Sequence, residues 1–404
     1  MAGGQNRALA FIFVTVALNS VGIGLIMPVM PDLLLSLSEG ASVGKAAAIG
    51  GWLTVSYALM QFLLSPTLGN LSDAYGRRPV MLVSLFVMAV DYLLMAIAPT
   101  LALLFVARIM AGAAASTFST ANAFIADISP PEERAQNFGL TGAAFGVGFV
   151  LGPAIGGVVG EFGPRMPFYA AAVLSFANFA FGLFVMPESL KPENRRPFSL
   201  ARANPLGVTF QMLKYPAVAW LLAATFIYSV SHYVYPSVWS YYTKEKFDWT
   251  PFEIGMSLAA VGVGFAIVQG FLIRRILPWL GEVKTAIFGF GIEVVALVCL
   301  AFATQGWMVF ALIPFNSLSA LSGPAMQGLM SNRIPDDAQG ELQGASSALT
   351  SLAFIFSPAL MTQLFFAFTV EGGIYFPGAP FLAGALITAA ATVPVLIAVR
   401  ARRA

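Results

Sequence analysis

The sequence predicts an all-α membrane protein with twelve transmembrane helices in two pseudo-symmetric six-helix bundles. Three observations predict it: an apolar composition, a series of long apolar runs and an internal repeat. Of the 404 residues, 58% are hydrophobic and only 10% are charged, against about 25% charged residues in ordinary soluble domains. The mean hydropathy is +0.81. The runs are continuous rather than alternating, which favours helices over the strands of a closed barrel.

Twelve apolar runs are long enough to cross a bilayer as helices, which takes about 20 residues each. We expect these helices over residues 8–30, 46–68, 79–98, 100–125, 137–160, 167–186, 216–242, 251–277, 282–303, 306–330, 340–366 and 377–400. We expect the first to be retained rather than removed as a signal peptide. Asn19 lies inside it, and no small-residue cleavage site follows.

The chain repeats itself with an offset of 205 residues. This offset aligns several pairs: Gly76 with Gly281, Pro130 with Pro335, Gly139 with Gly344, and Pro153 with Pro358. A polar interval rich in charge and proline separates the halves. We therefore predict an N-terminal bundle over residues 1–186, a cytoplasmic linker over 187–215 and a C-terminal bundle over 216–404. Such a layout is typical of transporters that rock two bundles about a central site.

The basic residues are distributed unevenly between the two sides of the predicted membrane. With a cytoplasmic N-terminus, 16 of the 21 Lys and Arg residues fall on the cytoplasmic side and four on the other, while Arg108 lies inside the fourth run. This is the bias of the positive-inside rule, so we expect both termini in the cytoplasm. The net charge of +2 indicates no nucleic-acid partner, and the lone Cys299 excludes an internal disulfide.

The stretch GNLSDAYGRRP concentrates charges between the second and third apolar runs, where we expect a short cytoplasmic loop. An acid such as Asp73 can stabilise the N-terminus of a neighbouring helix. Arg77 and Arg78 can pair with acids such as Asp127 at the end of the fourth helix. The alternative is that the arginines only anchor the topology, which leaves Asp73 unexplained.

The stretch GAAFGVGFVLGPAIGG, in the fifth run, combines regularly spaced glycines with a proline. Gly148, Gly152 and Gly156 recur every four residues, so they share one helix face and allow a neighbouring helix to approach closely. Pro153 removes a backbone hydrogen bond and can bend the helix. We interpret the stretch as a hinge or a sealed interface between bundles; the alternative is a tight helix contact without further function.

Both stretches resemble motifs of the major facilitator superfamily. The first resembles its loop motif between helices two and three, and matches at Gly69, Asp73, Gly76, Arg77 and Arg78. The second resembles the fifth-helix motif of its antiporters, and matches at Gly148, Gly152, Pro153, Gly156 and Gly157. MPES, at residues 186–189, looks like its sixth-helix ending. GIGLIMPVMPDLL, YALMQ and DYLLMA look like the tetracycline-efflux branch of its drug:proton antiporters.

The resemblance covers the whole chain and implies the major facilitator fold with alternating access. It implies that Gly69, Asp73, Gly76, Arg77, Arg78 and Asp127 form a conformational latch, made when the transporter faces outward and broken when it faces inward. The chain departs from the tetracycline branch at three positions. Asn19 replaces an acid in helix one, Phe265 replaces a histidine in helix eight, and Glu293 replaces an aspartate in helix nine.

Four ionisable residues stand out because they lie at bilayer depth within the predicted helices, where charge is costly and often functional. They are Asp91, Arg108, His232 and Glu293, and we predict that they carry proton coupling. Burial favours the neutral form of a carboxyl group such as Glu293. The alternatives are that Glu293 is a permanently paired structural acid, that Asp91 and Arg108 form a fixed ion pair, and that His232 makes a static hydrogen bond.

Polar and aromatic residues in the helices suit a cavity for a planar or amphipathic organic molecule. The predicted cavity residues are Asn19, Tyr57, Gln61, Asn122, Tyr228, Tyr233, Trp239, Phe265 and Gln327. The alternative is that many of the aromatic residues face lipid or the membrane interface.

We therefore predict a proton-coupled antiporter that exports a drug or other amphipathic organic compound across the bacterial inner membrane. It is expected to act as a monomer, to need no cofactor besides the proton gradient, and to be no enzyme, because the sequence shows no metal cluster, phosphate loop or nucleophile constellation. One alternative is a transporter of the same fold for a metabolite or siderophore, with or without coupling. Another is a sensor or scaffold that does not transport, against which the acids in the membrane argue.

Overall fold

The computed structural model describes residues 2–130, 133–199, 212–335 and 338–400, and the described chain is almost entirely helical. It contains twelve helical spans long and apolar enough to cross a membrane, within the described residues: Ala8–Ser36, Val43–Tyr75, Arg77–Ile97, Leu101–Ile128, Gln136–Gly160, Met166–Val185, Pro216–Phe247, Pro251–Leu280, Glu282–Phe302, Gly306–Ser331, Gln339–Ala367 and Ala379–Arg400. Each predicted apolar run lies on one of these spans. The predicted all-α, twelve-helix membrane fold is confirmed.

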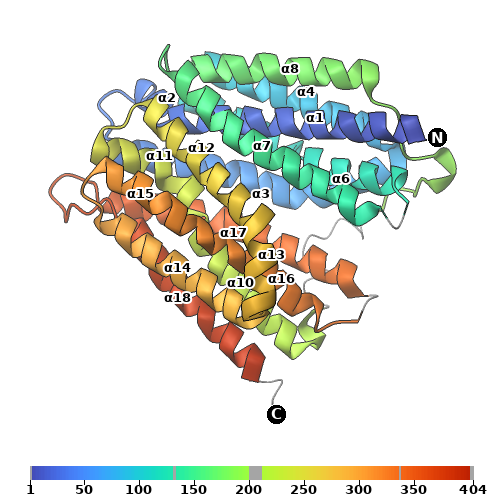
Figure 1. Cartoon of the computed structure of the whole chain (residues 1–404). Coiled ribbons are helices and arrows are strands. Elements are labelled where there is room, and N and C mark those ends of the chain that lie inside the picture. Colours follow the sequence, from blue (N-terminus) through green and yellow to red (C-terminus); the bar gives the residue numbers. More distant parts are fainter. Residues whose placement is uncertain (1, 131–132, 200–211, 336–337, 401–404) are drawn as a thin grey trace. The chain divides into compact units, whose positions relative to one another are not determined.

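Figure 1 labels the elements along the chain. The first half contains α1 (Ala2–Ile26), η1 (Met27–Val29), α2 (Met30–Ser36), α3 (Val43–Tyr75), α4 (Arg77–Ile97), α5 (Leu101–Ala113), α6 (Thr117–Ile128), α7 (Arg134–Gly160), α8 (Met166–Val185) and η2 (Pro192–Asn194). The second half contains η4 (Met212–Lys214), α10 (Pro216–His232), α11 (Val234–Phe247), α12 (Pro251–Ile267), η5 (Val268–Leu272), α13 (Ile273–Leu280), α14 (Glu282–Phe302), α15 (Gly306–Ser317), η6 (Leu318–Leu321), α16 (Ser322–Ser331), α17 (Gln339–Ala367) and α18 (Ala379–Arg400).

The contacts divide the chain into two compact units. Unit 1 comprises residues 1–39, 56–205 and 250–259, and unit 2 comprises residues 40–55, 206–249 and 260–404. Helices α3 and α12 therefore each run from one unit into the other. The division predicted from the sequence, with bundles over 1–186 and 216–404, stays a prediction. Residues 200–211 of the predicted linker lie outside the described residues.

The repeat of 205 residues is visible in the element boundaries. Helices α4 and α14 both contain 21 residues and start at Arg77 and Glu282, one offset apart. Helices α5 and α15 start at 101 and 306, and α7 and α17 start at 134 and 339. Gly76 and Gly281, which precede α4 and α14, have φ angles of 110° and 74°. Each half therefore begins its third span with the same glycine turn.

Several predicted single helices are broken inside the membrane span, which the sequence analysis missed. The first span contains η1, and the matching seventh span breaks at Tyr233, between α10 and α11. The fourth span breaks after Ala113. There the carbonyl of Ala114 accepts a hydrogen bond of 2.5 Å from the Ser84 hydroxyl and one of 2.9 Å from the backbone amide of Ser116. Such breaks are tolerated in a membrane when side chains satisfy the backbone. In transporters, discontinuous helices often line the binding site.

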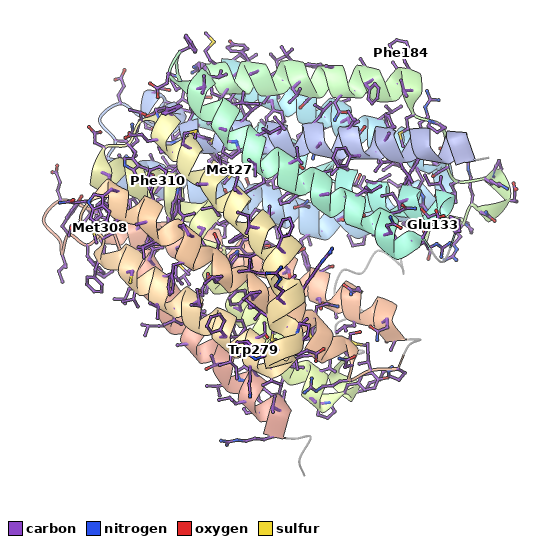
Figure 2. The ribbon with its side chains drawn as sticks, viewed as in Figure 1. Met27, Glu133, Phe184, Trp279, Met308 and Phe310 are labelled. Carbon is purple, nitrogen blue, oxygen red and sulfur yellow. The ribbon has the colours of Figure 1, made fainter. Side chains whose placement is uncertain are left out.

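Each unit has its own apolar core. In unit 1, α1, α4, α7 and α8 run side by side (Figure 1). The buried core of this unit includes Phe11 on α1, Leu85 on α4 and Phe124 on α6. In unit 2, Leu221, Phe290 and Leu329 belong to the corresponding core. Large apolar side chains also lie on the outer surface, such as Phe184 and Trp279 (Figure 2), which are 84% and 82% exposed. This exposure is expected where lipid is the solvent.

Candidate functional sites and family membership

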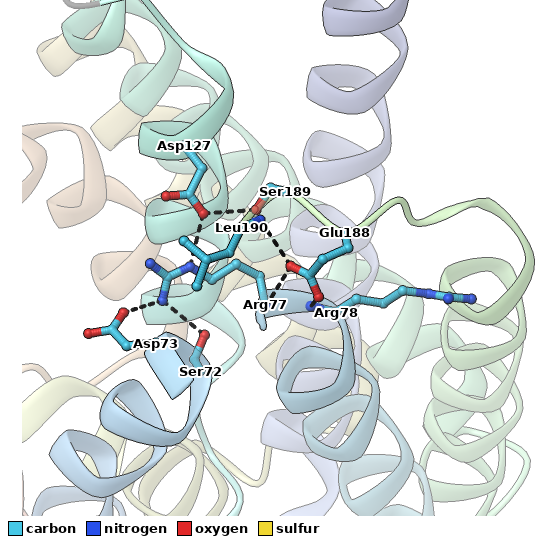
Figure 3. A network of polar contacts seen from close by, with 8 residues as sticks. All are labelled: Ser72, Asp73, Arg77, Arg78, Asp127, Glu188, Ser189 and Leu190. Atoms are coloured by element: carbon cyan, nitrogen blue, oxygen red, sulfur yellow. Dashed lines mark hydrogen bonds and ion pairs between the residues drawn. The ribbon is translucent and has the colours of Figure 1, made fainter. Parts of the chain in front are cut away.

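A network of charged residues in unit 1 surrounds Arg77, the first residue of α4 (Figure 3). Its guanidinium donates to Asp73 at 2.6 Å, to Asp127 at 3.0 Å and to Ser72 at 3.1 Å. Arg77 is buried, with 8% of its surface exposed. Two carboxylates and a hydroxyl therefore compensate the desolvation of one guanidinium, an arrangement that joins α3, α4 and α6.

The prediction that the stretch GNLSDAYGRRP forms a loop is wrong. Gly69 to Tyr75 continue α3 to its last residue, α4 starts at Arg77, and only Gly76 lies between the two helices. A φ of 110° lets glycine alone reverse the chain here without a steric penalty. Asp73 therefore sits on a helix and pairs with Arg77 within unit 1. The other arginine, Arg78, donates to the backbone carbonyl of Leu183 at 2.7 Å.

Glu188, which the sequence analysis did not assign to a site, caps the N-terminus of α4. Its Oε1 accepts hydrogen bonds from the backbone amides of Arg77 at 2.8 Å and Leu190 at 3.1 Å, and its Oε2 accepts from that of Arg78 at 3.2 Å. Ser189 donates to Asp127 at 2.9 Å. A carboxylate at this position accepts hydrogen bonds from amides that have no partner within the helix, and its negative charge interacts favourably with the positive end of the helix dipole. The available signal was the segment MPES, directly after the sixth span.

The helix-five motif forms a closely packed helix face, as predicted from its spacing. A Cβ added at Gly148, Gly152 or Gly156 would collide with the backbone or Ser20 on α1. Gly157 instead faces the first turns of α12 within unit 1, where a Cβ would meet the carbonyl of Pro251. Close approach of this kind requires small residues. The hinge role of Pro153, which lies inside α7, stays a prediction.

Asp91 and Arg108 pair inside unit 1. Asp91 on α4 has no exposed side-chain surface, and Arg108 on α5 is 11% exposed. The Arg108 Nε donates to Asp91 Oδ1 at 3.2 Å, and Nη2 forms an ion pair with Oδ2. The guanidinium carbon also lies 5.5 Å from the ring centroid of Tyr57. The structure thus brings together three of the predicted residues, as an ion pair with a cation–π contact.

Glu293 and His232 pair inside unit 2. Glu293 on α14 has no exposed side-chain surface, while 31% of the His232 side chain is exposed. His232 Nδ1 lies 3.1 Å from Glu293 Oε1, and Oε2 has no hydrogen-bond partner among the described residues. The predicted cavity residues Tyr228 and Phe265 stack on the imidazole, with centroids at 5.6 Å and 6.2 Å. This pair could not be read from the sequence, because its members lie 61 residues apart.

The other predicted cavity residues have varied surroundings. Asn122 accepts a hydrogen bond of 3.1 Å from Thr141, and Tyr233 packs on Phe354 at 5.0 Å. Trp239 is 3% exposed and lies against Phe381. Of the remaining three, Asn19 is 6% exposed, Gln61 is half-buried, and Gln327 has a buried amide nitrogen without a partner among the described residues. Their contact with cargo stays a prediction.

Comparison with known proteins identifies the family. The family profile described as Major Facilitator Superfamily matches residues 12–358 and 221–402. The chain belongs to the major facilitator superfamily. It is 42% identical to a tetracycline resistance protein, class C, of Escherichia coli over 90% of this chain and 91% of the relative. It is 38% identical to the class G protein of Vibrio anguillarum, over 87% and 88%.

A solved structure shows the same major facilitator fold. It is a bacterial homologue of the human lysosomal transporter Spinster in an inward-facing and occupied conformation. The TM-score is 0.78 at 15% identity, with 98% of this chain and 97% of the other covered. Membership of this superfamily makes the chain a transporter of small molecules rather than an enzyme, and a multi-pass inner-membrane protein. The predicted resemblance to the tetracycline-efflux branch is confirmed by these relatives.

Proposed function

We propose that this major facilitator protein is a proton-coupled antiporter that exports a drug or other amphipathic organic compound. The observation that carries the proposal is the pair of Glu293 and His232, a fully buried carboxyl group joined to a partly exposed imidazole inside a membrane span. Ionisable groups at this depth are costly and mark ion or proton pathways. The names of the relatives, tetracycline resistance proteins, support a drug as cargo.

Asp91 and Arg108 are proposed as the second element of coupling. The negative charge of Asp91 and the positive charge of Arg108 compensate each other as long as both residues are ionised. Protonation of Asp91 would break the ion pair and leave Arg108 with its contact to Tyr57. We propose that the network around Arg77 is the conformational latch and that Pro153, inside the closely packed α7, acts as a hinge during antiport. Both termini are proposed to be cytoplasmic, and the protein is proposed to act as a monomer without a cofactor.

The test uses proteoliposomes with an imposed pH gradient, in which uptake of tetracycline or another candidate drug and internal pH are recorded together. We expect cargo flux and proton flux of opposite direction in the wild type. Glu293→Gln should abolish the proton flux and reduce uphill cargo transport by at least tenfold, because an amide cannot titrate. Glu371→Gln, at an exposed carboxyl group after α17, is the control and should transport normally.

Two results would contradict the proposal. Cargo transport that runs equally well without a pH gradient would favour an uncoupled transporter of a metabolite or siderophore. Proton flux that is unchanged by Glu293→Gln together with Asp91→Asn would remove the coupling assignment from these residues.

A further inference from the structure

The last turns of span eight, in α13, have an apolar side and an exposed side. Ile273 and Ile276 pack against a small buried cluster of unit 2. The exposed residues here include two aromatic residues and two arginines, which form the basic face of span eight: Phe271, Arg274, Arg275 and Trp279. Phe271 is 72% exposed and Trp279 is 82% exposed (Figure 2). Arg275 and Trp279 lie four residues apart and are therefore neighbours on the helix surface.

The two arginines of the basic face have no acidic partner in the part of the chain that the structure describes. The ion pairs among the described residues are formed by other cations. The acid nearest along the chain, Glu282, accepts a hydrogen bond of 2.7 Å from Asn332. Neighbouring guanidinium groups repel each other unless an anion neutralises them. Arg274 and Arg275 therefore offer two planar sets of N–H donors to an anion from outside the chain.

The matching segment of the first half, 205 residues earlier, is arranged differently. Arg275 matches Asn70, which is 5% exposed and exchanges hydrogen bonds with the backbone of Ser199 in the linker. Pro278 matches Asp73, the acid that pairs with the first residue of α4. In the first half, a linker segment and a carboxylate thus occupy this surface. In the second half, the acid is replaced by proline and the surface carries exposed cations.

The position of the basic face along the helix matches the depth of the lipid headgroups. Span eight ends at Leu280, five residues after Arg275, which is about 7.5 Å along the helix. The headgroup layer of one leaflet is about 5–8 Å thick. Tryptophan is enriched at this depth, and an arginine side chain is long enough to reach the phosphates. The anions nearest to such a face in a bilayer are the phosphodiester groups of lipids.

We propose that the basic face of span eight binds the headgroup of an anionic phospholipid. Arg274 and Arg275 donate hydrogen bonds to the phosphodiester oxygens, and the exposed rings of Phe271 and Trp279 contact the glycerol region and the upper acyl chains. The bound lipid supplies, at this end of the second half, the negative charge that Asp73 supplies in the first half. With both termini proposed to be cytoplasmic, this lipid belongs to the cytoplasmic leaflet.

The test measures thermal unfolding of the purified full-length protein in detergent, with added phosphatidylglycerol or phosphatidylcholine of the same acyl chains. Phosphatidylglycerol should raise the unfolding temperature of the wild type more than phosphatidylcholine does, because only the first carries a net negative charge. Arg274→Gln combined with Arg275→Gln should weaken binding of phosphatidylglycerol by roughly thirtyfold, about fivefold for each arginine, and abolish this extra stabilisation. Both arginines are exposed, so the double variant should fold.

The matched control is Arg195→Gln combined with Arg196→Gln. These arginines are also adjacent and exposed, so their loss changes the net charge by the same amount. The control should keep the extra stabilisation by phosphatidylglycerol. A control that loses it as fully as the span-eight variant would overturn the proposal in favour of diffuse charge attraction. Full stabilisation of the span-eight variant would overturn it as well.

Two further probes identify the occupant of the basic face. Inorganic phosphate should neither stabilise the wild type nor displace phosphatidylglycerol, and stabilisation by phosphate alone would overturn the lipid assignment. Brominated phosphatidylglycerol should quench the fluorescence of Trp279, measured as the difference between the wild type and Trp279→Phe, more strongly than brominated phosphatidylcholine does. Equal quenching by the two lipids would contradict selective binding. These readouts are binding and stability, so they do not depend on the proposed antiport.

Discussion

Two glycine residues at matching positions of the two halves, Gly76 and Gly281, have different surroundings. Gly76 and Gly281 both precede a 21-residue helix, and both have a positive φ angle. A Cβ at Gly76 would collide with the Glu188 carboxylate, whereas a Cβ at Gly281 would meet no atom within 4 Å. The shared φ reflects the repeat, and the contact with Glu188 belongs to the first half alone.

This difference gives a matched pair of variants. Each of the substitutions Gly76→Ala and Gly281→Ala should lower the free energy of unfolding by roughly 1–3 kcal/mol, because alanine is strained at a positive φ angle. Gly76→Ala should lose more, because it also displaces the cap of α4. Thermal unfolding in detergent measures the difference. Equal losses of stability in the two variants would contradict this difference. In a double-mutant test, Glu188→Ala should lower the stability of the Gly76→Ala variant by less than it lowers that of the wild type.

At the scale of elements, short polar segments fix the ends of long apolar helices. Glu188 accepts hydrogen bonds from the first two amides of α4, and Ser189 holds Asp127 on α6. The start of the linker therefore contacts both partners of the Arg77–Asp127 ion pair. Glu188 acts through Arg77, as a residue that positions the network.

Glu188→Ala should remove about 1 kcal/mol of helix capping and slow transport, because Arg77 loses its fixed position. Glu193→Ala is the control, since Glu193 is exposed on η2 in the same linker. Glu188→Asp should restore part of the transport rate. The measurement is drug transport in proteoliposomes at equal protein content. Glu188→Ala with the activity of the control would rule out the positioning role.

The glycine face of α7 provides a second prediction at this scale. Gly156 lies against the carbonyl of Leu25 on α1, whereas Gly146, on the same helix, has no neighbour within 4 Å of an added Cβ. Gly156→Ala should therefore destabilise the protein by about 1–3 kcal/mol through overpacking. Gly146→Ala should be neutral or slightly stabilising, because alanine is the better helix former. Denaturation in detergent compares the two, and similar stabilities would contradict the packing argument.

At the scale of the molecule, the two halves keep the same geometry with different charges. Arg77 pairs with Asp127 in the first half, and the positions 205 residues later hold Glu282 and Asn332, which are joined by a hydrogen bond of 2.7 Å. The repeat thus retains a contact between matching elements, but only the first half has a cation, Arg77, at this contact. An ion pair responds to charge changes more than a bond to a neutral amide does. We therefore expect the first half to carry the conformational latch.

Asp73→Asn should slow or bias the alternation between conformations and leave cargo binding largely intact. The reason is that Asp73 contacts Arg77 at the end of α3 and lies outside the pairs at Asp91 and Glu293. Transport rate and cargo affinity measured on the same preparation separate these effects, with Glu193→Gln as the control. A loss of affinity as large as the loss of rate would place Asp73 in the cargo site instead.

The sequence determined the fold class, the number of spans and the repeat, because lipid forces every spanning segment to be a long apolar helix. It also pointed to Asp91, Arg108, His232 and Glu293, since polar residues stand out in such a chain. Only the tertiary structure decided which of them pair, because the choice depends on how neighbouring helices are rotated and broken. It showed that Asp91 pairs with Arg108 and that His232 pairs with Glu293. It also showed that Asp73, predicted in a loop, lies in a helix. It also revealed the cap by Glu188, because a contact across 111 residues leaves no periodic trace in the sequence.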